Sequence, residues 1–293
     1  ELKNVFKSFS LGIFSKKNNK SVLEDINLTL EAGDVIGLVG ENGAGKTTLL
    51  RIIMGLIGVS SGQVLYKDTK KPLFGYVNSN NRSFYWRLSV RENLIFFSKL
   101  LGLSNKETYK QIERLAYTLR IYSILDKPFM QISSGQMQAV NIARSLLGSP
   151  DFLLLDEPTT SLDYESAQSV TKTLQNYLSA TKTPAIWCSH NYVELKSVCN
   201  KIGILRKAQY SYQNINTHAF QDRAINYEFE IDIKNIREIQ SMADVSITKT
   251  NENTVYFISE DTNIYLDDIL KSLSILNVRV LSIQNTFSYS RYL

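Results

Sequence analysis

The chain has 293 residues, which is enough for one large domain or two of moderate size. Its hydrophobic content of 43% and charged content of 21% are ordinary for a globular protein, and without a run of about 18 apolar residues a membrane-spanning helix is excluded. The net charge of +5 is mild and spread along the chain, so it does not by itself indicate a nucleic-acid or membrane ligand. Cys188 and Cys199 lack metal-ligand spacing and favour ordinary buried thiols in a reducing cytosol.

The first part of the chain is predicted to form strands. Leu2–Phe9 favours an opening strand, and the basic cluster Lys16–Lys20 favours an exposed loop. Val22–Leu30 alternates apolar and polar residues in its second half, as a half-exposed strand does. The apolar run Val35–Val39 predicts a buried central strand.

A glycine-rich stretch follows that strand. Gly40–Thr47 fits the phosphate-loop pattern G-x-x-x-x-G-K-[ST], and Thr48–Met54 begins a helix. The glycines let backbone N–H groups turn toward phosphates, and the helix N-terminus adds partial positive charge. Lys46 can reach the β- and γ-phosphates, and the Thr47 hydroxyl can bind magnesium. The residues predicted to contact the nucleotide here are Gly40, Asn42, Gly43, Ala44, Gly45, Lys46, Thr47 and Thr48.

The middle of the chain alternates strands and helices, which predicts an α/β fold with a largely parallel sheet. Ser104 and Glu107 form a capping box for a helix to residue 121, and we expect Tyr109 and Ile112 on its core face with Leu115, Ala116 and Leu119. Ser133 or Ser134 caps a second helix. The remaining elements are strands at 63–66, 73–77, 152–156, 185–190 and 201–205 and a helix at about 164–180.

Two carboxylates end one of these apolar strands. Asp156 closes the run Phe152–Asp156, where phosphate-loop enzymes hold a magnesium-binding residue. Glu157 comes next and points differently, so it can polarise a water for attack on the γ-phosphate. Two surface acids at a strand end are the alternative interpretation.

Further motifs make residues 1 to 210 resemble the ATP-binding subunits of ABC transporters. Ile132–Gln136 resembles the family's signature, Ser161–Asp163 its D-loop and His190 its switch histidine, and the motifs follow the family's order. The resemblance implies a P-loop NTPase core with an antiparallel β subdomain and an α-helical signature subdomain. It also implies that ATP is held between the phosphate loop of one subunit and the signature of another, through Ser133, Ser134, Gly135 and Gln136.

The same resemblance implies partners and a mechanism. We expect a homodimer, or a heterodimer with a related ATPase subunit, bound to a permease on a separate chain at the cytoplasmic face of the cell membrane. The motif neighbourhood most resembles the branch that pairs with ABC-2-type exporters of drugs, lipid-linked glycans or polysaccharides. His190 would hold the γ-phosphate and the attacking water, and Phe9 would stack on adenine. A core role for Phe9 is the alternative, and Phe14 competes for adenine.

Two positions depart from the family pattern. Ser134 stands where the signature has glycine, and Asn78–Asn81 stands where the family has a magnesium-contacting glutamine, with Ser79 as the aligned position. These departures leave open a weakly hydrolysing regulatory subunit. A soluble ABC ATPase acting on nucleic acid or ribosomes is a further alternative, but the single ATPase unit and the lack of heptads count against it, so no nucleic acid is expected.

The segment Arg82–Ser89 combines Phe, Tyr, Trp and Arg, the composition of an interface hot spot. The family receives its permease in this region, and a locally packed loop is the alternative. After about residue 210 glycine and proline disappear. We predict an ATPase domain at 1–212 and a small ferredoxin-like βαββαβ domain at 220–293, for dimer contact or regulation.

Overall fold

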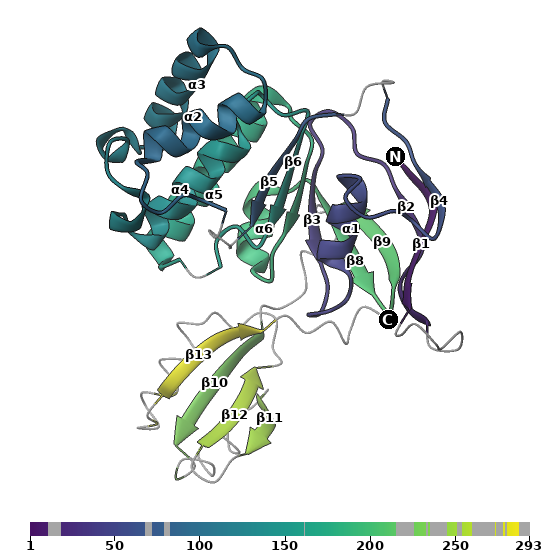
Figure 1. Cartoon of the computed structure of the whole chain (residues 1–293). Helices are drawn as coiled ribbons and strands as arrows, with labels where there is room; N and C mark the ends of the chain where they lie inside the picture. Colours follow the sequence, from purple (N-terminus) through teal and green to yellow (C-terminus); the bar gives the residue numbers. More distant parts are fainter. Residues whose placement is uncertain are drawn as a thin grey trace. The chain divides into compact units, whose positions relative to one another are not determined.

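A computed structural model describes residues 1–10, 19–67, 72–78, 83–160, 162–214, 226–232, 234, 245–250, 254–259, 273, 278 and 280–286 (Figure 1). The chain divides into two compact units, Glu1–Ile215 and Asn216–Leu293. Predictions on Phe14, Ser79 and Ser161 lie outside the described residues. No helix in the described part of the chain is both long and apolar enough to span a membrane.

The first unit is built on a six-stranded sheet, which confirms the predicted α/β fold. Its strand order is β5-β6-β7-β3-β8-β9, and only the edge strand β9 is antiparallel to its neighbour. The central strands are apolar throughout because both faces are covered. The strands are β3 (Val35–Val39), β5 (Phe74–Asn78), β6 (Phe152–Asp156), β7 (Ala185–Cys188), β8 (Lys201–Arg206) and β9 (Gln209–Asn214).

Strand β9 was missed by the sequence prediction. It pairs with β8 through a two-residue turn, and the turn residues Lys207 and Ala208 both have positive φ, 45° and 68°. Such turns usually contain Asn and Gly, so this hairpin carries no ordinary turn signal.

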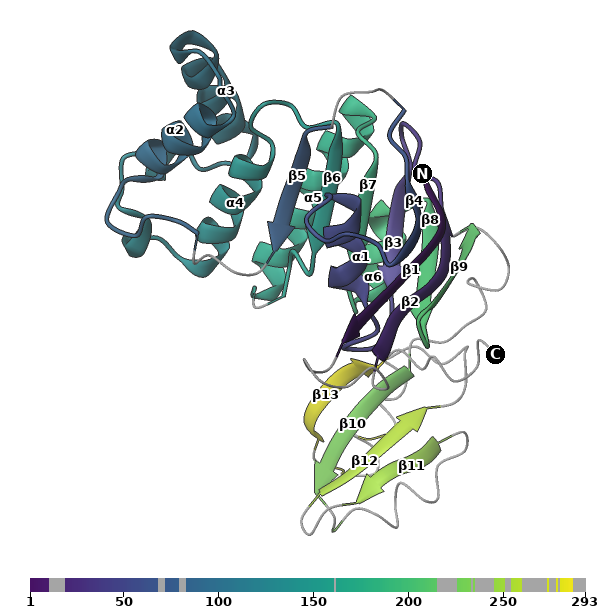
Figure 2. The same cartoon turned by 45° about the vertical axis from the view of Figure 1, so that its right-hand side comes forward.

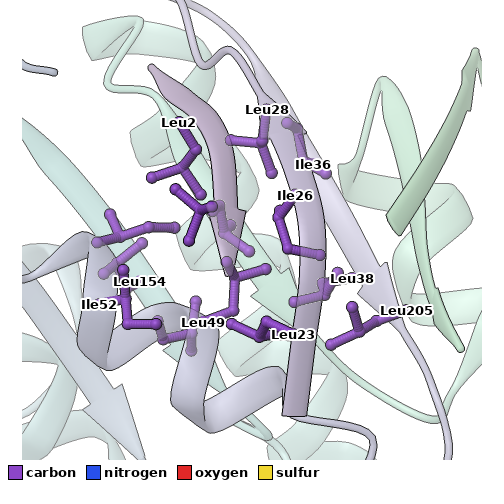
Figure 3. Packing of buried hydrophobic residues seen from close by; sticks show 14 of the residues in the cluster. Leu2, Leu23, Ile26, Leu28, Ile36, Leu38, Leu49, Ile52, Leu154 and Leu205 are labelled. Carbon is purple, nitrogen blue, oxygen red and sulfur yellow. The ribbon is translucent and has the colours of Figure 1, made fainter. Parts of the chain in front are cut away.

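A three-stranded antiparallel sheet, order β2-β1-β4, packs over helix α1 (Lys46–Ile53), as Figure 2 shows. Its strands are β1 (Leu2–Ser10), β2 (Asn19–Leu28) and β4 (Ser61–Val64). The predicted strand at 63–66 therefore ends earlier, at Val64. Leu23 and Ile26 of β2 meet Leu49 of α1 and Leu38 of β3 in one fully buried cluster (Figure 3). This core holds α1, and with it the phosphate loop, against the central sheet.

A helical arm carries the signature. It comprises α2 (Val90–Leu100), α3 (Asn105–Thr118), α4 (Ser134–Ser145) and the short 3₁₀ turns η1 (Tyr122–Ile124) and η2 (Phe129–Gln131). Ser104 and Glu107 form the predicted capping box on α3. Tyr109 was placed wrongly on the core face, because 51% of it is exposed. The buried stripe instead begins at Thr108, so Tyr109 lies at its edge and its long side chain reaches solvent.

Two further helices flank the central sheet of the first unit. Helix α5 (Tyr164–Thr181) follows the predicted bounds closely, and Asp163 caps it by accepting the N–H of Ser166 at 2.9 Å. Helix α6 (Tyr192–Val198) was not predicted.

The second unit contains a four-stranded antiparallel sheet in the order β11-β12-β10-β13. One strand therefore lies between β10 and β11, and one between β12 and β13, which is the strand order of a ferredoxin-like domain. The strands are β10 (Asn226–Asp232), β11 (Val245–Thr250), β12 (Thr254–Ser259) and β13 (Val280–Thr286). The two helices of the predicted βαββαβ pattern fall between β10 and β11 and between β12 and β13, where most residues lie outside the described ones.

Candidate nucleotide site

The phosphate loop lies between the end of β3 and the start of α1. Gly45 caps α1 with a φ of 107°, in the left-handed region that strains other residues. A Cβ on Gly40 would lie 2.5 Å from the backbone oxygen of Leu205, so β8 leaves room only for glycine. The neighbouring loop residues differ in burial: Asn42 and Gly43 are exposed, and Ala44, Thr47 and Thr48 are half-buried.

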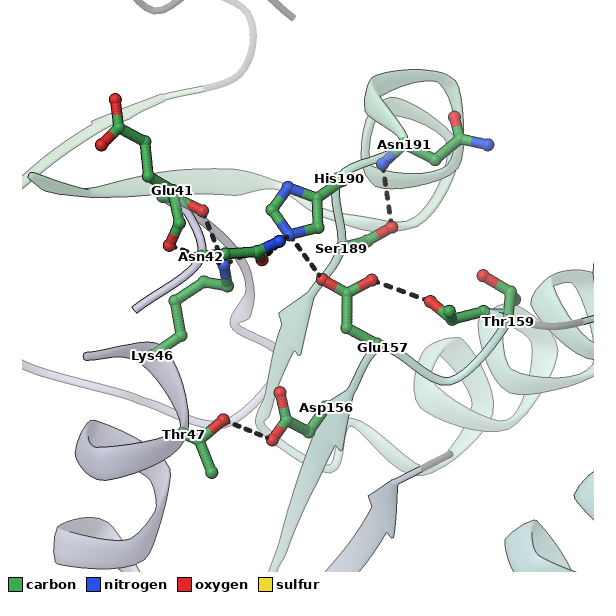
Figure 4. Close-up of polar contacts among 12 residues, drawn as sticks. Glu41, Asn42, Lys46, Thr47, Asp156, Glu157, Thr159, Ser189, His190 and Asn191 are labelled. Carbon is green, nitrogen blue, oxygen red and sulfur yellow. Dashed lines mark hydrogen bonds and ion pairs between the residues drawn. The ribbon is translucent and has the colours of Figure 1, made fainter. Parts of the chain in front are cut away.

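Lys46 lies inside the loop. Its side chain is buried, and its Nζ donates to the backbone oxygens of Gly40 at 2.6 Å and Glu41 at 3.3 Å (Figure 4). The same Nζ lies 3.4 Å from Nε2 of His190. The loop therefore surrounds an ammonium group, which suits an anionic ligand.

Asp156 faces the helix that follows the loop. The Thr47 hydroxyl donates to Oδ2 of Asp156 at 2.8 Å. The Tyr76 hydroxyl donates to the same oxygen at 3.2 Å. Burial, and then the charge of Asp156, raise the pKa of Tyr76 to about 12, so the phenol stays a neutral donor at pH 7. Sequence reasoning missed Tyr76, whose β5 position pairs with Leu154, two residues before Asp156.

Glu157 and His190 contact each other. Glu157 has a φ of 54°, which turns its side chain away from that of Asp156, and its Oε2 accepts from the Thr160 hydroxyl at 3.0 Å. Its Oε1 lies 3.1 Å from Nε2 of His190, which is also 3.1 Å from Oδ1 of Asn42. His190 was predicted at a strand end, but β7 ends at Cys188, and His190 lies in the turn that follows.

The signature residues begin α4. Ser133, of the two serines considered, is the N-cap, and its capping box with Gln136 has bonds of 3.0 and 3.3 Å. Ser134 is exposed at the first helical position. A Cβ on Gly135 would lie 2.8 Å from Oγ of Ser166, so glycine keeps α4 close to α5. Among the hydrogen bonds of the described residues, none joins this segment to the phosphate loop.

The structure gives the exposure of the aromatic side chains singled out in the sequence. Phe9 is 40% exposed on β1, so the alternative core role for it is wrong. The centroid of its ring lies 4.8 Å from Nζ of Lys7. In the aromatic segment, Phe84 is buried and stacks on Phe129 with ring centroids 4.4 Å apart. Trp86 is 48% exposed and Tyr85 similarly so. Local packing therefore explains Phe84, whereas the next two aromatic side chains remain available to a partner.

Proteins of similar sequence show to which family the chain belongs. A sequence profile described as "ABC transporter" matches residues 23–160. The "ABC transporter ATP-binding protein NatA" of Bacillus subtilis (strain 168) is 31% identical over 225 residues, covering 73% of this chain and 91% of NatA. The chain belongs to the ATP-binding proteins of ABC transporters. Members of this family bind and hydrolyse ATP, and this ABC ATPase is therefore an ATP-binding subunit of a transporter.

Other relatives of this ABC ATPase are named for different substrates, and one name includes a transport direction, import. The "Maltose/maltodextrin import ATP-binding protein MalK" of Yersinia pestis is 32% identical over 210 residues, covering 70% of this chain and 55% of MalK. The "ABC-type organic anion transporter ABCA8B" of Mus musculus is 30% identical over 232 residues. The match covers 78% of this chain but only 14% of the mouse protein.

Solved structures confirm the fold of the ABC ATPase. The cassette MJ0796, in a dimeric post-hydrolysis state bound to ADP and Pi, superposes with a TM-score of 0.65 at 22% identity, covering 73% of this chain and 98% of the cassette. CbiO1 of Clostridium perfringens, part of the transporter complex cbiONQ, also reaches 0.65 at 23% identity, covering 75% and 90%.

Proposed function

We propose that this ABC ATPase powers export of a drug, lipid-linked glycan or polysaccharide through a permease on a separate chain, by ATP-driven dimerisation. The observation that carries the ATP-hydrolysing part of the proposal is the pairing of Thr47 with Asp156 and of Glu157 with His190 at the phosphate loop. The export part extends the resemblance of the motifs to the branch that pairs with ABC-2-type exporters. These pairs bring together groups for binding phosphate, holding a metal ion and activating water.

ATP binds along the phosphate loop. The backbone N–H groups of Gly40, Asn42, Gly43, Ala44, Gly45, Lys46, Thr47 and Thr48 and the N-terminus of α1 supply donors and positive potential for its phosphates. Lys46 exchanges its bonds to the oxygens of Gly40 and Glu41 for phosphate oxygens. The exposed ring of Phe9 offers a stacking surface to adenine.

The residues around Asp156 fit magnesium. The Thr47 hydroxyl and the Asp156 carboxylate are oxygen ligands, and Ser79 is a predicted third ligand outside the described residues. The described residues hold no cluster of three or more His, Cys, Asp or Glu side chains suited to a metal. A bound magnesium ion, held largely by phosphate oxygens and waters, would neutralise phosphate charge.

Glu157 and His190 carry the hydrolytic step. The Glu157 carboxylate polarises a water, whose oxygen bonds to the γ-phosphorus while the bond from that phosphorus to the bridging oxygen breaks. The bridging oxygen leaves with the electron pair as ADP, and Glu157 accepts the water proton before releasing it to phosphate. His190, whose Nε2 lies 3.1 Å from Oε1 of Glu157, holds the γ-phosphate and the water.

A second subunit completes the site. Ser133, Ser134, Gly135 and Gln136 form a helix N-terminus, which binds anions, and they make no hydrogen bond to the phosphate loop of their own chain among the described residues. Their ligand is therefore the γ-phosphate on a second copy or a related ATPase. The dimeric, ADP-bound state named for MJ0796 supports this arrangement.

The permease contacts the exposed aromatic segment at the cytoplasmic face of the cell membrane. Tyr85, Trp86 and Leu88 are exposed in the segment before α2, beside the buried anchor Phe84. Rigid aromatic side chains around a packed centre are typical of interface hot spots. A photo-crosslinker at Trp86 should capture an integral membrane protein from native membranes, and one at the exposed Tyr117 of α3 should not. Equal capture from both positions would contradict this assignment.

Phosphate release by the purified full chain tests the catalytic assignment. Wild type should release phosphate from Mg-ATP, and Glu157→Gln should bind ATP without turnover and accumulate as a dimer. A weakly hydrolysing regulatory subunit is the second candidate, because Ser134 adds a side chain at the exposed start of α4. Restoration of fast turnover by Ser134→Gly would favour that candidate, and unchanged turnover would favour the first.

A further inference from the structure

Glu194 is a buried carboxylate outside the groups assigned to ATP. It lies in α6 and only 7% of it is exposed. A buried carboxylate is costly unless hydrogen bonds compensate its lost hydration. The bonds that Glu194 makes therefore indicate why it is there.

Its partners come from two separate segments. The Ser189 hydroxyl donates to Oε2 of Glu194 at 2.6 Å. The Thr159 hydroxyl lies 2.9 Å from Oε1 and 3.0 Å from Oε2 of the same carboxylate. Ser189 is itself buried, and its Oγ accepts the backbone N–H of Asn191 at 3.0 Å, so its hydroxyl hydrogen is directed to Glu194.

Each segment also carries one member of the catalytic pair. Ser189 immediately precedes His190, and Thr159 follows Glu157 by two residues (Figure 4). Because Oε1 of Glu157 lies 3.1 Å from Nε2 of His190, the contacts close into a ring. The ring runs from Glu157 along the chain to Thr159, through the Glu194 carboxylate to Ser189, and along the chain to His190.

We propose that Glu194 is a positioning residue that sets the distance between His190 and Glu157 through Ser189 and Thr159. The inference rests on the proposed function, because Glu194 acts through the catalytic roles given to Glu157 and His190. It assigns no contact between Glu194 and ATP. Each backbone turn is anchored on one side by β6 or β7 and on the other by the same carboxylate. Loss of the carboxylate releases both anchors, which separates the catalytic side chains and leaves the phosphate loop in place.

The first test is Glu194→Gln and Glu194→Ala in the full chain. A misplacement of about 1 Å can cost a hundredfold in rate, so we expect Glu194→Ala to lower kcat by about tenfold to a hundredfold. Glu194→Gln retains one acceptor oxygen and should recover part of that loss. The KM for ATP should change by less than about twofold, because the phosphate loop, which supplies most of the phosphate ligands, stays in place. Glu113→Gln, which removes a surface carboxylate paired with Arg91, is the matched control and should match wild type.

The second test asks whether the ring acts as a unit. Ser189→Ala and Thr159→Val each open it at one place, so the double variant should lose no more kcat than Glu194→Ala alone. These two mild variants also keep the test decisive if Glu194→Ala does not fold. Wild-type kcat in Glu194→Gln, losses that multiply in the double variant, or an equal loss in ATP affinity would overturn the proposal. Failure here leaves the Glu157→Gln result intact, whereas an active Glu157→Gln variant would remove the proposed function itself.

Discussion

Nε2 of His190 lies 3.1 Å from Oε1 of Glu157. The two residues follow neighbouring parallel strands, β6 and β7, whose carboxyl ends meet at one edge of the sheet. Because β6 and β7 are neighbours, the turns that follow them lie together beside the phosphate loop, although they are distant in sequence.

Replacing Glu157 with glutamine should abolish turnover while preserving ATP binding. The amide keeps the size of the side chain but is a much weaker base, and general-base catalysis is worth about 10²–10⁴-fold. Single-turnover phosphate release should therefore fall by at least about a hundredfold, with ATP affinity within about threefold of wild type. A variant that hydrolyses ATP at the wild-type rate would remove Glu157 from the mechanism.

Lys46→Ala should weaken ATP binding. Hydrogen bonds to charged groups contribute about 1.5–3 kcal/mol, so the Kd should rise by at least about tenfold. Equilibrium titration with a fluorescent ATP analogue measures it directly. Lys110→Ala, at an exposed position of α3, removes the same charge elsewhere and should leave the Kd unchanged. If both variants bind equally well, Lys46 does not contact phosphate.

Tyr76→Phe should raise the magnesium concentration needed for half-maximal ATP binding. The phenol donates to Oδ2 of Asp156, and its loss leaves Thr47 as the one hydroxyl that the described structure places on that oxygen. We expect a shift of about tenfold, with nucleotide binding in EDTA unchanged. Tyr66→Phe, whose hydroxyl donates to the backbone oxygen of Ile53, is the control. Identical magnesium titrations for all three proteins would show that Tyr76 does not orient Asp156.

Leu49→Ala should destabilise the first unit. Leu49 is fully buried in the core that holds α1, and a buried leucine-to-alanine change costs about 2–5 kcal/mol. Urea unfolding followed by Trp187 fluorescence reports the change, because Trp187 is fully buried in β7. The matched control is Leu56→Ala. Because Leu56 is largely exposed, this substitution should lower the free energy of unfolding only slightly. Equal losses of unfolding free energy in the Leu49→Ala and Leu56→Ala variants would mean that this cluster does not stabilise the unit.

Alkaline pH should destabilise the protein partly through Tyr210. Burial, and then the neighbouring Tyr212, raise the pKa of Tyr210 above its usual value of 10. The unfolded chain therefore ionises first, so this contribution to stability is complete below about pH 10 and falls as pH rises further. Unfolding free energies between pH 9 and pH 11, measured for Tyr210→Phe, should fall less steeply than for wild type. A parallel decline would exclude Tyr210 as a source of alkaline sensitivity.

Helix α2 was not predicted from the sequence, because polar residues occupy part of its buried face. Ser89 and Glu92 form a capping box there, and this signal was available in the sequence. Asn93 and Ser98 are fully buried on the core face, where Asn93 donates to the backbone oxygen of Tyr85 at 3.0 Å. Polar residues on that face interrupt the apolar stripe by which helices are predicted.

Elements with local signals could be predicted from the amino-acid sequence. The phosphate loop of Gly40–Thr47, the apolar strand ending in Asp156 and the capped start of the signature helix each depend on neighbours along the chain. By contrast, the contact of Tyr76 with Asp156 and the link that Glu194 makes between Ser189 and Thr159 became evident only from the folded structure. These contacts depend on the strand order β5-β6-β7-β3, and no local pattern encodes which strands lie side by side.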